Sequence, residues 1–97
     1  MEKLKLNSPI MDEFGQIVIK DMTIGQSLAS RLMKSVSNDE TKILKFYNWA
    51  KVLGKDNPLE LDEVDAELLK QFVINDQELF NIVKAPVVRA INSLKFK

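Results

Sequence analysis

The first twenty residues carry the alternation of apolar and polar positions that is typical of β-strands. Leucines alternate with lysines over residues 3–6, and two isoleucines recur two positions apart at Ile17 and Ile19. Between them, Asp12–Gly15 has the chemistry of a type I turn, with Asp at its first position and a glycine that can adopt a positive φ. We therefore expect residues 1–20 to form a β-hairpin that lies on other elements, because an isolated hairpin is only marginally stable.

Beyond the hairpin, the apolar positions follow the helical period of three to four residues. Thr23–Gln26 has the spacing of a capping box and predicts a helix over residues 23–36. Ser37–Glu40 repeats that spacing and predicts a second helix over residues 38–53, with Gly54 as the residue that stops it.

The second half of the chain predicts two more helices. An extended segment at Leu59–Leu61 leads into an acidic N-cap and a helix over residues 62–74. Asn75–Glu78 is a third capping-box-like set and predicts a helix over residues 76–94. Pro86 lies inside this last helix, so we expect a kink or a restart there.

These elements predict an α+β fold, in which an N-terminal β-hairpin packs across three or four short helices. A chain of 97 residues has room for one hydrophobic core, so residues 1–97 should form a single domain. We expect helix to make up half of the chain or more. The predicted core is Leu6, Ile17, Ile19, Leu28, Leu32, Ile43, Phe46, Ala50, Leu68, Phe72, Leu79, Val83, Val87 and Ile91.

The composition excludes several classes of chemistry. The chain has no cysteine and no histidine, which excludes disulfides, zinc sites built from those residues, thiol nucleophiles and imidazole bases. The acids over residues 62–67 lack the central glycine and the ligand spacing of a calcium loop. We therefore expect a protein that is not an enzyme and holds no cofactor and no metal.

The sequence also indicates where the protein resides. No apolar run approaches the roughly 18 residues of a membrane span, and the first residues lack the apolar stretch of a signal peptide. We expect a cytoplasmic protein with no membrane partner.

Charges are separated along the chain, although 14 basic and 14 acidic residues cancel overall. Residues 56–80 hold eight acids and one base, whereas residues 81–97 hold four bases and no acid. Opposed patches could steer self-association or a protein partner. The alternative, which we favour, is that the acids stabilise a helix start and the basic tail is solvated. The four tail bases are Lys84, Arg89, Lys95 and Lys97.

Two aromatic residues are candidates for contact outside the domain. Trp49 lies at the margin of the apolar stripe of its helix, so we expect it to be about half exposed. It is either an interface anchor or a large core residue with its indole nitrogen at the surface, and we favour the core. Phe96, beyond the last helical pattern, is the better interface candidate.

The basic tail also leaves a second functional class open. Together with Phe96, its four bases could bind nucleic acid, which would make the protein a small nucleic-acid-associated regulator. A neutral domain with four bases at one end has only a shallow, salt-dependent affinity for phosphates, so a nucleic-acid partner is the weaker hypothesis.

Taken as an ordered pattern, the chain resembles small proteins encoded among the structural genes of tailed phages and prophages. The segments that carry the resemblance are residues 3–10, 12–19, 23–29, 45–50, 59–62 and 84–91. The resemblance implies a setting, virion assembly in an infected or lysogenic bacterial cytoplasm. The family has no assigned enzyme activity and no known catalytic residues, so no role is carried over to individual positions. Our leading hypothesis is a non-catalytic protein–protein interaction protein, either a phage or prophage assembly factor or a minor structural component, whose partner is a phage protein or a second copy.

Overall fold

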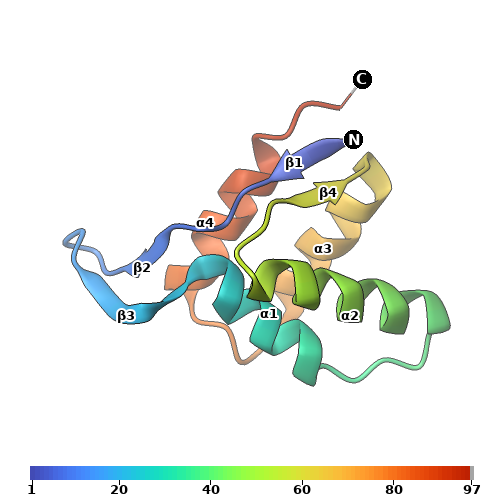
Figure 1. Cartoon of the computed structure of the whole chain (residues 1–97), viewed down its shortest axis with the longest axis horizontal. Helices are drawn as coiled ribbons and strands as arrows, with labels where there is room; N and C mark the ends of the chain where they lie inside the picture. Colours follow the sequence, from blue (N-terminus) through green and yellow to red (C-terminus); the bar gives the residue numbers. More distant parts are fainter. Residues whose placement is uncertain (97) are drawn as a thin grey trace.

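Strands come first along the chain and helices follow, in the α+β arrangement that the sequence predicts (Figure 1). The computed structural model describes residues 1–96, apart from the side chain of Lys20. The helices contain 11, 15, 13 and 12 residues, which is 51 of the chain's 97 and confirms the expected helix content. The elements are β1 (Glu2–Leu4), β2 (Pro9–Met11), β3 (Ile17–Thr23), α1 (Ile24–Lys34), α2 (Glu40–Gly54), β4 (Leu59–Leu61), α3 (Glu63–Asn75) and α4 (Asn81–Asn92).

The hairpin at the N-terminus is shorter than expected, because the first strand pairs elsewhere. β1 runs antiparallel to β4, with Leu4 opposite Leu59 and Glu2 opposite Leu61. Leu4, Leu59 and Leu61 are all buried, so this pairing places three leucines in the core. Only β2 and β3 form a hairpin, which makes the expected hairpin over residues 1–20 wrong for its first strand. The extended segment at Leu59–Leu61 is confirmed as a strand.

The predicted turn between β2 and β3 is confirmed. The Gly15 amide donates to the Asp12 carbonyl at 3.1 Å, and the Asp12 amide donates to the Gln16 carbonyl at 2.9 Å. Gly15 has a φ of 76°, a left-handed conformation that a side chain would disfavour.

The start of α1 is fixed by its capping box and by the chain before it. The Gln26 amide donates to the Thr23 hydroxyl, and the Gln26 side chain accepts from the Thr23 amide, as the sequence predicts. The amides of Ile24 and Gly25 have no partner within their own helix. They donate to the carbonyls of Ser8 and Leu6 at 2.9 and 2.7 Å, so the helix begins in contact with the N-terminal segment.

The ends of α2 differ from the expectation by a few residues. Asp39 caps the helix by accepting from the amides of Thr41 and Lys42, so the predicted Ser37–Glu40 capping box is wrong. A carboxylate one residue before the helix reaches these amides directly. Gly54 is the last residue of α2, and the left-handed conformation falls at Asp56 (φ 59°) instead.

Helix α3 begins as predicted, whereas α4 begins later than predicted. Asp62 accepts from the Asp65 amide at 2.7 Å and caps α3. The third capping box does not form, because its N-cap position, Asn75, is the last residue of α3 and Asp76 is the C-cap of that helix. Helix α4 therefore starts at Asn81, and it continues through Pro86 without a restart.

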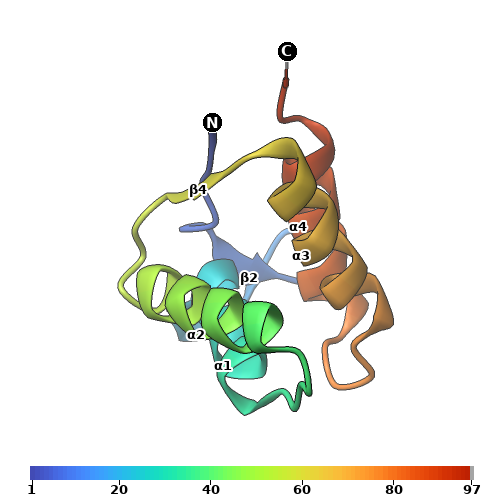
Figure 2. The same ribbon diagram turned by 90° about the vertical axis from the view of Figure 1, so that its right-hand side faces the viewer.

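The core lies between two helix pairs, α1 with α2 and α3 with α4, which the turned view separates (Figure 2). Three predicted core residues are wrong, because Ile17, Ile19 and Ile43 are exposed, while Leu68 and Phe72 are partly buried at its edge. The other nine are confirmed as buried: Leu6, Leu28, Leu32, Phe46, Ala50, Leu79, Val83, Val87 and Ile91.

Candidate functional site

The β2–β3 hairpin, residues 9–23, is the most apolar exposed element of the molecule, and we name it the hairpin arm. In Figure 1 it extends at the left beyond the helices. Apolar residues occur on both faces of its second strand, so packing the arm onto the domain cannot bury them all. Patches of this kind mark contact sites on soluble proteins. Its exposed large apolar residues are Met11, Phe14, Ile17, Val18, Ile19 and Met22.

Phe14 occupies the tip of the arm in an ordered turn. The Asp12 carboxylate accepts hydrogen bonds from the amides of Phe14 (2.9 Å) and Gln16 (3.0 Å). The Phe14 side chain is 79% exposed. An aromatic side chain on a preorganised turn can enter a partner's pocket with little further loss of conformational freedom.

The apolar surface continues from the base of the arm to the start of α4. A cavity of about 210 Å³ lies there, with Ile19 and Met22 on the arm side and Leu79 and Phe80 on the α4 side. Phe80 is exposed, although it is the N-cap of α4. Residues 20–22 have no opposite residue in β2, because the register of the hairpin shifts between Ile10 and Pro9.

A second exposed apolar surface lies where α1 meets α2, and we name it the α1–α2 corner. Two cavities of about 260 and 120 Å³ flank the loop over residues 35–37, and Phe46 lines both of them. The exposed apolar residues of the corner are Met33, Val36, Ile43, Leu44 and Tyr47.

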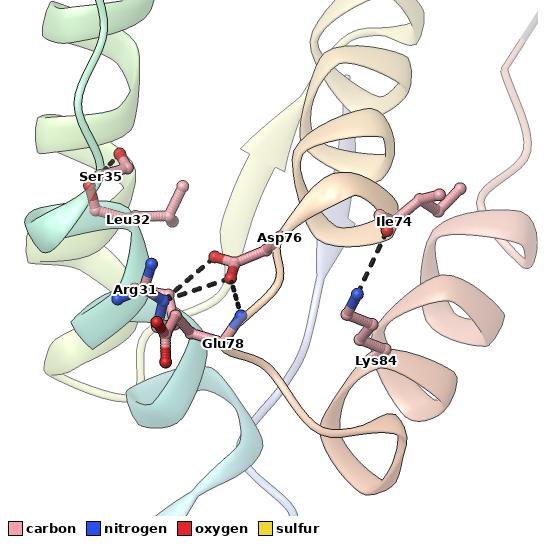
Figure 3. A network of polar contacts seen from close by, with 7 residues as sticks. All are labelled: Arg31, Leu32, Ser35, Ile74, Asp76, Glu78 and Lys84. Atoms are coloured by element: carbon pink, nitrogen blue, oxygen red, sulfur yellow. Dashed lines mark hydrogen bonds and ion pairs between the residues drawn. The ribbon is translucent and has the colours of Figure 1, made fainter.

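A polar network joins the end of α1 to the segment between α3 and α4 (Figure 3). The Arg31 Nε donates to Asp76 Oδ2 at 3.1 Å, and the Glu78 amide donates to Asp76 Oδ1 at 2.6 Å. The Asp76 side chain is only 3% exposed. Because this carboxylate has lost most of its water, removal of Arg31 would leave a nearly buried charge without its cation.

One lysine of α2 has a perturbed titration. The Lys45 ammonium donates to the Asp65 carboxylate on α3, and this hydrogen bond raises the pKa of Lys45 above its ordinary value. The charges of Asp65 and Asp62 act in the same direction, and desolvation acts against them. The contact joins α2 to the acidic start of α3.

Trp49 lies in the core, which agrees with the alternative that we favoured. Its side chain is 7% exposed, so the expected half-exposed position is wrong. The ring centroids of Trp49 and Phe46 are 5.6 Å apart, and those of Phe46 and Phe72 are 5.0 Å apart. An aromatic cluster therefore holds the indole, and Trp49 offers no surface to a partner.

The other predicted site residues do not form one patch. The Lys84 ammonium donates to the Ile74 carbonyl at 3.2 Å and so caps the end of α3 (Figure 3). Arg89 is exposed on α4. Phe96 is partly buried against the core, and the Lys95 amide donates to Glu2 at 3.4 Å. Lys97 lies outside the described residues.

The acidic segment and the basic tail meet within one chain. Lys95 and Phe96 line a cavity of about 450 Å³ together with Asp62 and Glu63, at the start of α3. Lys84 also contacts α3, at its other end. This proximity leaves less unbalanced charge for head-to-tail contact between copies than the sequence indicated.

Sequence reasoning missed both exposed apolar surfaces. The signal for the arm was present, because Ile17–Ile19 is an unbroken apolar run that interrupts strict alternation. The signal for the corner was that the apolar residues of α2 cover a wider arc of the helix than its buried face does. Ile43 and Tyr47 extend this arc to one side of the buried Phe46 and Ala50.

These features define a small α+β domain with two exposed apolar surfaces. Over residues 1–96 the structure brings together no group of three or more acidic side chains that could hold a metal ion. Within the same residues, no helix has the length and apolar character to cross a membrane. No protein-family model, characterised protein or solved structure matches the chain significantly, so the resemblance to phage proteins stays a prediction.

Proposed function

We propose that the protein is a non-catalytic interaction protein that binds another protein through its hairpin arm. The observation that supports this most strongly is the apolar surface of residues 9–23, with Phe14 at the tip of an ordered turn. The surface lies on an element that projects from the domain, so a partner can approach it from several sides (Figure 1).

The arm offers apolar side chains whose burial would favour binding. Burying one exposed phenylalanine side chain contributes about 1.5–3 kcal/mol. The isoleucines beside the turn add to this. The costs of association consume part of the gain, so the net affinity depends on how well a partner's pocket fits Phe14.

The resemblance to proteins of tailed phages supplies the setting of the proposal. The partner is then a phage structural or assembly protein in the bacterial cytoplasm, and the protein is an assembly factor or a minor structural component. Gene neighbourhood supports this setting if capsid, portal or tail genes lie alongside.

The test measures binding to the purified products of the neighbouring structural genes. We expect one of them to bind with an affinity in about the micromolar range, and Phe14→Ser to weaken it by about tenfold or more. Val64→Ser, which removes an exposed apolar side chain on α3, is the matched control and leaves binding within about twofold. The proposal is wrong if no neighbouring product binds, or if Phe14→Ser binds as the wild type does.

The alternative function, a nucleic-acid-associated regulator, gains no specific support from the tail. Two of its bases contact the protein itself, Lys84 through the Ile74 carbonyl and Lys95 through its backbone and the acidic cavity. DNA titration at two salt concentrations tests this alternative, since phosphate binding weakens steeply as salt rises.

A further inference from the structure

The α1–α2 corner combines an unpartnered apolar flank with a shallow groove. Ile43 and Tyr47 are four residues apart, on the same flank of α2, and both are about half exposed. Together with Met33 of α1 they line the cavity of about 120 Å³. The buried face of α2 is a different one, centred on Phe46 and Ala50, so the core does not need this flank.

The groove extends across the loop between the two helices. Val36 is 92% exposed and lines the larger cavity, on the other side of the loop over residues 35–37. Leu68 and Phe72 of α3 form the far wall of that cavity. The apolar hollows therefore follow one another over α1, the loop and α3, which suits an elongated ligand.

The charge around these hollows is mainly positive, although Asp76 also lines the larger one. Residues 31–55 contain six bases and two acids. Two of the bases, Arg31 and Lys45, form ion pairs with Asp76 and Asp65. Lys34, Lys42 and Lys51 are exposed and take part in none of the ion pairs that the structure shows over residues 1–96.

Two of these lysines lie beside the apolar positions themselves. Lys42 lines the larger cavity, and the Lys51 ammonium is 5.5 Å from the centre of the Tyr47 ring. A ligand that fills the hollows thus meets ammonium groups at its margins. Apolar contacts at the centre with opposite charges at the rim are the usual composition of a protein interface.

We propose that the α1–α2 corner binds an acidic amphipathic helix of a partner protein. Apolar side chains at positions i, i+3 or i+4, and i+7 of that helix fill the two hollows beside the loop over residues 35–37. Its Asp and Glu side chains face Lys34, Lys42 and Lys51. The corner lies at the end of the molecule away from the hairpin arm, so both surfaces can be occupied together (Figure 1).

The test uses a synthetic helical peptide of about 18 residues, which is about five turns, with leucines on one face and glutamates on the other. Its labelled form is titrated with the intact protein and followed by fluorescence anisotropy. We expect saturable binding, and binding about tenfold weaker for the same peptide with lysines in place of the glutamates. Raising the salt from about 0.05 to about 0.5 M should weaken binding of the glutamate peptide.

Variants of exposed residues locate the site without disturbing the core. Tyr47→Ser and Lys42→Glu should each weaken binding by about fivefold or more, whereas Val64→Ser and Phe14→Ser leave it within about twofold. The urea midpoint of each variant shows whether it is folded, and Ile43→Ser replaces Tyr47→Ser if that variant is not.

Three outcomes would overturn the proposal. The first is no saturation of binding up to about 1 mM protein, which corresponds to a negligible affinity. The second is equal affinity for the glutamate and lysine peptides. The third is a wild-type dimer in sedimentation equilibrium that dissociates in Tyr47→Ser, which would assign the corner to a second copy of this chain.

Discussion

Replacing Gly25 by alanine tests how the first helix is packed against the N-terminal segment. Gly25 lies in the first turn of α1, and its amide donates to the Leu6 carbonyl at 2.7 Å. A Cβ at this position would lie 3.0 Å from the Leu6 carbonyl oxygen and 3.2 Å from the Leu6 Cβ. Neither atom is the end of a flexible side chain, so the backbone around the buried Leu6 must shift.

The magnitude follows from two opposing effects. Alanine is favoured over glycine in a helix by about 1 kcal/mol at most, and less in the first turn. Forcing an extra methyl group into a packed site costs about 1–3 kcal/mol, and weakening the amide bond to Leu6 costs about 1 kcal/mol more. We therefore expect Gly25→Ala to lower the free energy of unfolding by about 1–3 kcal/mol, a large part of a total of about 5–15 kcal/mol.

Urea unfolding followed by Trp49 fluorescence measures this loss, because Trp49 is buried and is the only tryptophan of the chain. With a slope near 1 kcal/mol per M, the midpoint should fall by about 1–3 M. Gly54→Ala is the control, since no atom lies within 4 Å of its added Cβ, and its midpoint should stay the same or rise. A Gly25→Ala midpoint equal to or above that of the wild type would refute the packing argument.

Three other predictions concern single polar contacts. Arg31→Met leaves the nearly buried Asp76 carboxylate without its cation and should cost about 2 kcal/mol in urea unfolding, with a smaller effect in an Asp76→Asn background. Asp65 raises the pKa of Lys45, so the wild type should be more stable than Lys45→Met below the ordinary lysine pKa of 10.5. This stability difference should vanish as the pH rises through the raised pKa of Lys45, and thermal midpoints of both proteins between about pH 8 and 12 measure it. Asp12→Ala removes the side-chain acceptor of the hairpin turn, and should speed amide hydrogen exchange at the tip of the arm while changing global stability by less than about 0.5 kcal/mol. One result would contradict each prediction in turn: a urea midpoint unchanged by Arg31→Met, a stability difference between wild type and Lys45→Met that does not depend on pH, or amide hydrogen exchange at the tip unchanged by Asp12→Ala.

Three features that depend on residues within four positions of one another were predicted correctly from the sequence, although the Ser37–Glu40 and Asn75–Glu78 capping boxes were not. The Thr23–Gln26 capping box, the Asp12–Gly15 turn and the Asp62 cap all formed, because the interacting groups are brought together by local backbone geometry alone. The α+β class followed from the same local signals, since the period of the apolar positions distinguishes strands from helices.

Features that depend on distant residues could not be predicted. The pairing of β1 with β4 joins Leu4 to Leu59, and no local pattern near Leu4 indicates that partner. The predicted Asn75–Glu78 box fails because α3 runs through Asn75, and the Asp76 carboxylate binds Arg31, 45 residues earlier, as well as the Glu78 amide. The local motif shows neither the extent of α3 nor the cation on another helix.

Exposure of the two candidate surfaces could not be predicted for a related reason. The apolar period shows which residues share a face of α2, but not whether another element covers that face. Ile43 would be buried if a further helix packed on the corner, and the chain supplies none over the described residues. The same holds for Ile17 and Ile19 on the arm.

The pairing of β1 with β4 has a consequence for the order in which the chain folds. The hydrogen bond between Leu6 and Gly25 closes a short loop and can form as soon as α1 exists. The β1–β4 sheet must wait for a segment more than fifty residues later, and the entropy lost in closing a loop grows with its length. Docking of α1 onto residues 6–8 would shorten the part of that loop that is still free, so we expect the helix to orient the first strand before its sheet partner pairs with it.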